Sequence, residues 1–323
     1  MAIRAALISY FELEDLPRLL QALAGSGMPP DTRVHVGSFG VSPDASEQIR
    51  AVPTRRYSPM FKTQRTAAWE RRRLTPREEQ LVGPRFRGPV PPESRILQMS
   101  AAQRVAWGVE VGRRYRDTMR AARRSGVRID SWQLDELATQ LAGAQGRQYR
   151  EFVRGILQGL TFGRRVLGDR ESKGFVWGTR RALRLASLPV TAELTAFWRQ
   201  LDRACFRIVG EEYPDFVGDP RRAASTWSDG QRALASGGPV RRALAGRYVA
   251  GMTPGYRIGR GLGGNVRGLS RADVNRWRTA YVAERARQGL AGFGEYHFVF
   301  ENSRTFVMQD ACRAVARGMA LVG

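Results

Sequence analysis

IRAALISYFE at residues 3–12 and RVHVGSFG at residues 33–40 are apolar stretches with the composition of buried β-strands. Between them, residues 16–23 have the spacing of a short helix, and MPPDT at residues 28–32 is a loop. A strand, a helix and a second strand in this order favour parallel pairing through a right-handed crossover. The start of the chain therefore predicts an α/β protein built on a parallel sheet.

Strands and helices alternate to the end of the chain, which extends the α/β class to its whole length. Ser270 has the position of a helix N-cap, and Asp273 three residues later completes a capping-box pattern. Further strands are expected at residues 127–134, 173–179 and 290–302, with a weaker candidate at 248–252. Further helices are expected at residues 101–124, 144–160, 191–209 and 220–235, after Ser270, and at 303–321.

The predicted fold is a (β/α)8 barrel of the TIM type with a long loop insertion, and an open doubly wound α/β sheet is the alternative. A barrel typically needs about 250 residues and tolerates insertions, so a chain of 323 residues suits a single barrel domain. A doubly wound sheet usually has a glycine-rich turn after its first strand. Here that strand runs into YFELEDLP at residues 10–17, which contains no glycine. The barrel is therefore preferred.

Residues 41–100 interrupt the alternation. They are rich in proline and arginine and have no clear period, and VGPRFRGPVPPES at residues 82–94 has the composition of a loop. A long stretch without structure of its own is usually a functional insertion. We expect residues 41–100 to form a loop-rich excursion over the active-site face of the barrel.

The chain is strongly basic, with a formal net charge of +23. Such a charge suggests a polyanionic partner, either nucleic acid or an anionic glycan. However, all of the 53 basic residues except Lys62 and Lys173 are arginines, spread along the whole chain. Near-total use of arginine is typical of a GC-rich, bacterial genome, so nucleic acid is disfavoured as a partner. The arginine-rich segment 55–87 is the candidate surface for an alternative function, polyanion binding without catalysis.

The motifs predict no cofactor and no metal. His35 and His297 are the only histidines, and no Cys or His spacing is typical of a zinc site. Cys205 and Cys312 lie within helical patterns and are expected as buried thiols or as one disulfide. GRGLGG at residues 259–264 fits the dinucleotide-binding pattern, but it does not follow a clear strand. The sequence contains no Walker loop and no G-x-S-x-G elbow, which argues against NTPases and esterases of those types.

The hydropathy of the chain predicts no membrane span, because no run approaches the roughly 20 apolar residues that a span needs. MAIRAALISYFE at residues 1–12 lacks the long apolar region and the cleavage site of a signal peptide. The chain enters its first predicted strand almost at once, which fits a mature domain whose signal was removed. A secreted location is therefore favoured over a cytoplasmic one.

Candidate functional residues are sought where the apolar stretches end, because parallel α/β folds carry function at the carboxyl ends of their strands. Acids and aromatic residues recur at these positions. The candidates at these ends are Tyr10, Glu12, Trp132, Gln133, Asp135, Glu136, Trp177, Glu295, Tyr296, His297 and, later on the last strand, Glu301. Glu211, Glu212 and Tyr213 are further candidates, which follow a helical pattern and precede a proline.

A mixture of acids and aromatic residues has a use in carbohydrate chemistry. Sugar rings have apolar faces that stack on Trp and Tyr, and their hydroxyl groups are bound by Asp and Glu. Cleavage of a glycosidic bond generally needs two carboxyl groups, one as acid and one as nucleophile or base. A tryptophan beside a carboxyl group raises its pKa by desolvation, as a general acid requires.

The chain resembles (β/α)8-barrel glycoside hydrolases in three stretches, DSWQLDEL at 130–137, GFVWG at 174–178 and GFGEYHF at 292–298. Each is an apolar strand with aromatic residues, and the first and third also carry an acid. The resemblance implies a carbohydrate substrate and catalytic carboxyl groups at the ends of a middle and a late strand. Asp135 or Glu136, together with Glu295, are the matching positions, although an acid on the final strand departs from the commonest order. An anionic polysaccharide would also use the arginines.

Structural roles are the alternative for the same residues. Asp135 and Glu136 are equally consistent with first-turn helix acids, which the helix macrodipole favours. Glu212 is consistent with a solvated helix end, and His297 with a structural histidine. Glu295 lies in a glycine-rich stretch that allows close approach of a ligand, but it could instead pair with an arginine.

Overall fold

The structure is a computed structural model that describes residues 4–10, 21, 26–27, 34–38, 55–62, 93–124, 132–135, 141–167, 173–205, 207–212, 218–252, 269–288, 295–301 and 305–321. It contains an eight-stranded sheet in which every recorded pairing is parallel. The strands are β1 (Arg4–Tyr10), β2 (Val34–Ser38), β3 (Arg55–Lys62), β4 (Gln133–Asp135), β5 (Lys173–Gly178), β6 (Arg207–Glu212), β7 (Tyr248–Met252) and β8 (Glu295–Glu301).

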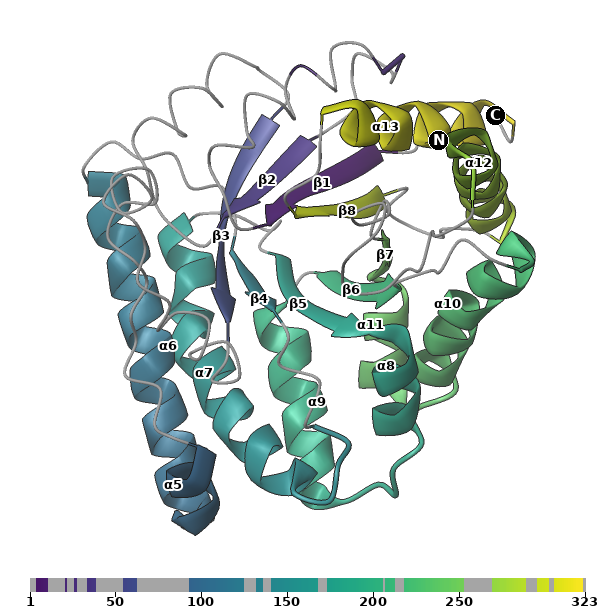
Figure 1. The fold of residues 1–323 in the computed structure, drawn as a ribbon. Coiled ribbons are helices and arrows are strands. Elements are labelled where there is room, and N and C mark those ends of the chain that lie inside the picture. Colours follow the sequence, from purple (N-terminus) through teal and green to yellow (C-terminus); the bar gives the residue numbers. More distant parts are fainter. Residues whose placement is uncertain are drawn as a thin grey trace.

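The order of strands in the sheet is β1-β8-β7-β6-β5-β4-β3-β2. Neighbours in the sequence are therefore neighbours in space, and the first strand pairs with the last. β1 and β2, at the two ends of this order, lie side by side (Figure 1). A doubly wound sheet has its first strand in the middle and reverses direction there, which this order does not do. Sequential order with β1 beside β8 is the order that a (β/α)8 barrel requires.

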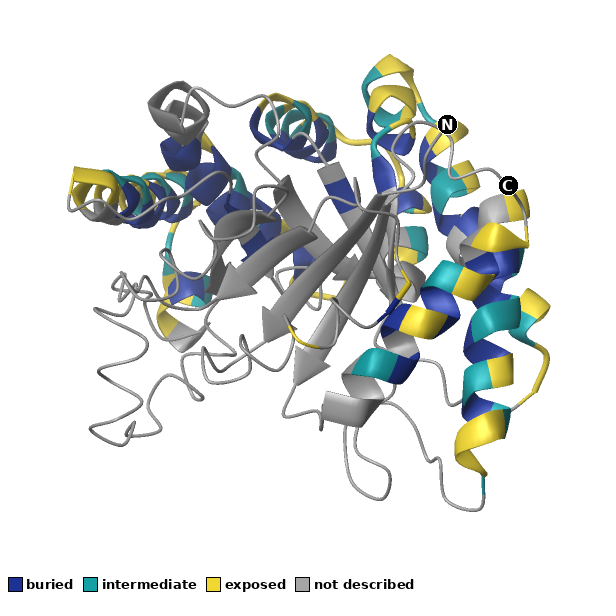
Figure 2. Ribbon diagram, turned by 90° about the horizontal axis from the view of Figure 1, so that it is seen from above, coloured by how far each residue is buried: buried dark blue, intermediate teal, exposed yellow. Residues whose placement is uncertain are grey.

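Helices surround the sheet (Figure 1). Figure 2 shows that their buried residues are turned toward the strands and their exposed residues away from them. Among the described residues, no helix is both long and apolar enough to cross a membrane. The helices are α5 (Glu93–Gln98), α6 (Ala101–Arg124), α7 (Gly146–Leu167), α8 (Thr179–Ala186), α9 (Ala192–Ala204), α10 (Pro220–Ala235), α11 (Pro239–Ala245), α12 (Arg271–Arg287) and α13 (Thr305–Ala320).

Local capping explains why several helices begin where they do. The Thr191 hydroxyl oxygen accepts a hydrogen bond from the Leu194 amide at 3.1 Å at the start of α9. The Asp219 carboxylate accepts one from the Arg221 amide at 2.9 Å at the start of α10. At the start of α12, the predicted Ser270 cap is confirmed, since its hydroxyl oxygen accepts from the Asp273 amide at 3.1 Å. Each contact satisfies a backbone N–H that has no partner inside the helix.

Two strands occur where the sequence predicted something else. Residues 41–100 were expected as loop, but β3 lies within them and pairs with β2 and β4, and α5 closes the segment. Residues 191–209 were expected as one helix, but α9 ends at Ala204 and β6 begins at Arg207. Of the predicted excursion, residues 41–54 and 63–92 lie outside the described residues, so their position over one face of the sheet stays a prediction.

Cys205 and Cys312 are free thiols, and both are completely buried. Of the two alternatives that the sequence left open, buried thiols and a disulfide, the structure has the buried thiols. Cys205 ends α9 and Cys312 lies within α13. Cys312 lies near Arg278 of α12, so it belongs to the packing of α13 against α12.

Candidate active site

The carboxyl ends of the strands form the candidate active site. Because all strand pairings are parallel, the strands end at one edge of the sheet. Three of them end in acids, which are Asp135 of β4, Glu212 of β6 and Glu301 of β8. The other end residues are Tyr10, Ser38, Lys62, Gly178 and Met252.

Asp135 is the last residue of β4, as the sequence predicted for the end of a strand. It pairs in register with Lys62, the last residue of β3. Just before it, Leu134 is almost completely buried. Asp135 and Lys62 thus end neighbouring strands in register, and the burial of Leu134 anchors β4 in the core.

Trp132 immediately precedes β4 and is 0% exposed. It was expected to bind substrate, but a fully buried ring has no face open to a sugar. Trp132 is therefore a core residue. Its position near the end of a predicted strand drew attention to it, whereas its burial depends on what packs around the sheet. Gln133, also expected to bind substrate, pairs in register with Met60 of β3.

Glu211 and Glu212 close β6 rather than a helix. Glu211 pairs in register with Gly178, the last residue of β5, and Glu212 pairs with Met252, the last residue of β7. Trp177, a predicted substrate-binding residue, pairs with Gly210. These residues lie at the same edge of the sheet as Asp135. For Trp177 the sequence predicted a strand end, whereas Glu211 and Glu212 were expected to follow a helix, and that expectation is corrected by β6.

Glu295 does not lie at that edge. It is the first residue of β8 and pairs in register with Arg4, the first described residue of β1. Tyr296 and His297 follow it in the amino-terminal half of the strand. Six further residues of extended chain, about 20 Å, separate Glu295 from the carboxyl end. The expectation that Glu295, Tyr296 and His297 meet Asp135 at the carboxyl ends is therefore wrong.

Glu301 takes the place that Glu295 was expected to have. It is the last residue of β8 and pairs in register with Tyr10, the last residue of β1. The sequence also pointed to Glu301, because the apolar run continues past the glycine-rich start of the strand through Phe298 and Phe300, but it favoured Glu295 as the catalytic position. The candidates Glu12, Glu136 and Tyr213 lie outside the described residues.

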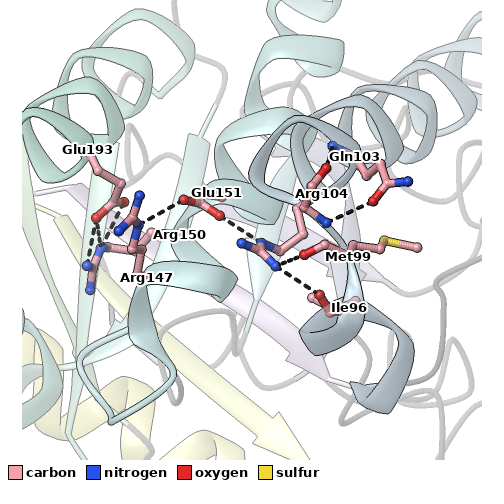
Figure 3. Close-up of polar contacts among 9 residues, drawn as sticks. Ile96, Met99, Gln103, Arg104, Arg147, Arg150, Glu151 and Glu193 are labelled. Carbon is pink, nitrogen blue, oxygen red and sulfur yellow. Dashed lines mark hydrogen bonds and ion pairs between the residues drawn. The ribbon is translucent and has the colours of Figure 1, made fainter.

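Ion pairs near the starts of α6, α7 and α9 connect these three helices (Figure 3). Arg150 of α7 binds Glu193 of α9, and its Nη1 donates to the Leu141 carbonyl at 2.6 Å. Beside it, Glu151 accepts from Arg104 of α6 at 2.7 Å and from Arg147 at 3.1 Å. These contacts fix the start of α7 relative to α6 and α9.

Arg104 also holds the helix that precedes it. Its guanidinium donates to the carbonyl oxygens of Ile96 and Met99 at the end of α5 (Figure 3). The last carbonyls of a helix have no partner inside the helix, and a basic side chain satisfies them. These hydrogen bonds therefore fix the end of α5 relative to the start of α6. Within the described part of the chain, no group of three or more His, Cys, Asp or Glu side chains is placed to hold a metal ion.

Comparison with known proteins gives a likeness in structure and none in sequence. No protein-family model matches the chain, and no curated protein matches its sequence. Among solved structures, it is similar to the crystal structure of a GH18 chitinase from Pseudoalteromonas aurantia, with 12% identity and a TM-score of 0.53. The match covers 97% of this chain and 100% of that chain. At this identity the likeness concerns the fold, which is similar to that of a glycoside hydrolase.

Proposed function

We propose that this protein is a glycoside hydrolase that cleaves a poly- or oligosaccharide at the carboxyl ends of its parallel strands. In this proposal the chain is a single domain, the sheet closes between β1 and β2 into a (β/α)8 barrel, and residues 63–92 cover the same edge. One observation carries the proposal: in a fold similar to that of a chitinase, Asp135, Glu212 and Glu301 end three parallel strands at one edge. Acids at one edge supply the groups that glycosidic cleavage requires.

The acids support two arrangements. In the first, one carboxyl group protonates the leaving oxygen, and a second acts as nucleophile or as the base that activates water. Asp135 or Glu136 is proposed as one member, and Glu212 or Glu301 as the other. A separation of about 5–5.5 Å between the carboxyl groups gives retention, and roughly 6.5–9.5 Å gives inversion. In the second arrangement the substrate itself assists, so that one protein acid is enough.

The proposed substrate is a neutral or anionic glycan. Tyr10 and Trp177 lie at or next to the carboxyl ends of β1 and β5, where aromatic rings can stack on sugar rings. Because the similar structure is a chitinase, chitin and its oligosaccharides are the first substrates to test. An anionic polysaccharide is the second, since a net charge of +23 favours its approach.

Polyanion binding without catalysis is the less favoured function. Among the described residues, arginines of several helices are engaged in ion pairs, as in Arg114–Glu110, Arg147–Glu151 and Arg287–Glu284. Such pairing reduces the positive charge left for a partner. Retention on immobilised heparin or duplex DNA against salt tests this function, since specific phosphate binding weakens with a log–log slope of about −0.9 per contact on DNA. Binding that persists at about 0.15 M salt, without glycan cleavage, would favour it.

The proposed function is tested by assaying the purified protein on chitin oligosaccharides, neutral polysaccharides and anionic polysaccharides. Asp135→Asn, Glu136→Gln and the double variant are compared with wild type. We expect the double variant to lose about 10²- to 10⁴-fold in kcat, the range typical of a general acid or base. Glu110→Gln, on the exposed side of α6, is the matched control. Absence of cleavage on the whole panel, or full activity of the double variant, would overturn the proposal.

A further inference from the structure

The two edges of the parallel sheet differ in charge. At the carboxyl edge, three of the eight described strands end in an acid and one ends in a base. At the opposite edge, where the strands begin, the charges are reversed. Four strands, β1, β3, β5 and β6, begin with Arg4, Arg55, Lys173 and Arg207, and one strand, β8, begins with an acid, Glu295. The amino-terminal edge is therefore the basic edge of the sheet.

Two of these bases, Lys173 of β5 and Arg207 of β6, lie next to each other. They pair in register at the starts of neighbouring strands. Residues in register on neighbouring strands are about 4.8 Å apart, and like charges at such positions repel each other. The corresponding pair at the starts of β1 and β8, Arg4 and Glu295, combines opposite charges. An anion from outside the sheet would stabilise the starts of β5 and β6, because a sheet has only a small dipole of its own.

Three helices add arginines at the same edge. α6, α7 and α9 pack side by side (Figure 1). They run parallel, because two glycines of α6 face two glycines of α7 in the same order along both helices, and an ion pair joins the starts of α7 and α9. Only two residues separate the end of α9 from the start of β6. The last turns of the three helices therefore lie at the basic edge. They contain Arg123 and Arg124 of α6, Arg164 and Arg165 of α7, and Arg203 of α9.

These helix and strand ends form one region, which we call the basic sector. It consists of Arg123, Arg124, Arg164, Arg165, Lys173, Arg203 and Arg207. Of these residues, Arg123, Arg124 and Arg203 have exposed side chains. The helix macrodipole favours a base in the last turn of a helix, but it does not account for bases at the starts of strands.

The acids of neighbouring segments do not cancel the charge of the basic sector. Asp202, in the last turn of α9, already pairs with Arg247, whose Nη1 also donates to the Cys205 carbonyl at 2.9 Å. The segments between α6 and β4 and between α7 and β5 contain two bases, Arg128 and Arg170, and three acids, Asp130, Asp169 and Glu171. The sector therefore keeps an excess of positive charge.

We propose that the basic sector binds a linear anionic polysaccharide at a surface separate from the proposed active site. Arg207 and Glu212 lie at opposite ends of β6, about 17 Å apart, so a polymer bound at the sector is not at the edge proposed for cleavage. Guanidinium groups bind oxyanions through two parallel hydrogen bonds. This binding does not require that the protein cleaves a glycan.

The distribution of the bases favours a flexible polymer over duplex DNA. They come from the ends of α6, α7 and α9 and from the starts of β5 and β6. Proteins that read duplex DNA usually place one helix or ribbon in a groove, and the ends of five separate elements do not form such a unit. A flexible chain can follow charges that are spread over several elements.

The test compares two triple variants with the same change in charge. The helix-end variant combines Arg123→Gln, Arg124→Gln and Arg203→Gln. The helix-start variant, which is the matched control, combines Arg221→Gln, Arg222→Gln and Arg276→Gln. These control arginines are also exposed and lie near the starts of α10 and α12. The dissociation constant for heparin, a linear anionic polysaccharide, is measured at about 0.05 M salt, where such contacts are weakly screened, and urea titrations check that each variant is folded.

We expect the helix-end variant to bind heparin on the order of 100-fold more weakly than wild type, since each basic residue near an anionic surface contributes about fivefold. The helix-start variant should stay within about threefold of wild type, because long-range attraction by net charge is largely screened. Both variants should cleave a short neutral oligosaccharide as wild type does, because neither changes the carboxyl edge.

Lys173→Glu tests the strand starts. The substitution places opposite charges in register on β5 and β6, which favours strand pairing, and it removes positive charge from the basic sector. We expect the urea midpoint to stay constant or rise, while the dissociation constant for heparin rises by about 10- to 30-fold. A lower midpoint with unchanged heparin affinity would mean that Lys173 has a structural role, and it would overturn the part of the strand starts in binding.

The remaining outcomes separate this proposal from the proposed function. Absence of heparin binding by wild type overturns the basic sector as a binding surface, and so does an equal loss of affinity in the two triple variants. Tighter binding of duplex DNA than of heparin, with the same loss in the helix-end variant, overturns the polysaccharide as the partner. If wild type binds heparin through the sector but cleaves no glycan, the binding surface stands and the glycosidase function fails.

Discussion

Gly108 of α6 and Gly155 of α7 lie against each other without a side chain between them. A Cβ on Gly108 would be 2.9 Å from the Gly155 Cα and 2.2 Å from the Phe152 carbonyl oxygen. One turn further along, Gly112 and Gly159 repeat the arrangement, with a Cβ on Gly112 2.9 Å from the Gly159 Cα. Two matching G-x-x-x-G patterns therefore bring the backbones of α6 and α7 into direct contact, so that these helices cross more closely than side chains would allow.

Gly108→Ala is expected to destabilise the protein by about 1–3 kcal/mol, because the added methyl group forces α6 and α7 apart. The free energy of unfolding in urea measures the change. Gly238→Ala is the control, since nothing lies within 4 Å of a Cβ there and its φ of −64° suits any residue. The control should differ from wild type by no more than about 1 kcal/mol. Equal stability of Gly108→Ala and wild type would contradict the close crossing.

Glu151→Gln is expected to lower the free energy of unfolding by about 3–5 kcal/mol, since the substitution leaves the buried Arg104 guanidinium without its counter-charge. Glu151 and Arg104 have side chains only 3% and 10% exposed. Glu110→Gln removes an ion pair of similar geometry in which both side chains are about half exposed, and it should cost no more than about 1 kcal/mol. If Glu151→Gln and Glu110→Gln lower the free energy of unfolding by similar amounts in the same urea titration, burial does not increase the cost of breaking the Arg104–Glu151 ion pair.

Cys312 is expected to be unreactive toward thiol reagents in the folded protein. Burial raises its pKa to about 12, and the nearby Arg278 charge opposes this shift only in part. The reactive thiolate is therefore almost absent at pH 8. Labelling of Cys205→Ser, in which Cys312 is the one remaining cysteine, should be slow in buffer and fast in denaturant. Rapid labelling in buffer would contradict the burial.

The same shift predicts the direction of a pH effect on stability. In the unfolded chain the Cys312 thiol ionises near its ordinary pKa of 9.0, whereas the folded state retains the proton up to about pH 12. The unfolded state therefore binds fewer protons in this window, and the contribution of Cys312 to stability is full below pH 9 and falls as the pH rises above it. Urea titrations of wild type and Cys312→Ala at increasing pH measure this difference.

Glu301→Gln is expected to lower kcat/KM on the cleaved glycan by about 10²- to 10⁴-fold, because Glu301 is a proposed member of the carboxyl pair and a general acid or base contributes about this much. Glu295→Gln is expected to leave kcat/KM unchanged, because Glu295 begins β8 whereas Glu301 ends it. The two substitutions are chemically identical and lie on one strand, so each serves as the control for the other. Loss of activity in Glu295→Gln alone would mean that the opposite edge of the sheet carries the chemistry.

Much of the helical structure could be predicted from local sequence. The helices at 101–124 and 220–235 were predicted with the bounds that α6 and α10 have, because caps and apolar periodicity lie within the helix itself. The strand β3, RRYSPMFK, was missed because arginine, proline and lysine are unfavourable in isolated strands. Its stability comes from pairing with β2 and β4, and β4 lies far away in the sequence.

The candidate site was predicted in part. Asp135 ends a strand as expected, because an apolar run followed by acids marks that boundary locally. Glu295 was assigned to the wrong edge, because the sequence contains the apolar run but not the register that pairs its first residue with Arg4. Trp132 was expected to bind substrate but is buried. The sequence does not show this, because the exposure of a residue depends on what packs over its strand.

The sequence by itself determined the α/β class, the cap at Ser270, and the general order of strands and helices, because hydrogen bonds and apolar periodicity act between residues a few positions apart. Only the tertiary structure decided which end of β8 meets Asp135, how closely α6 approaches α7, and which guanidinium holds Leu141. These features depend on contacts between segments that are distant in the chain, and the free energy of such contacts comes from burial and pairing that no single segment has on its own.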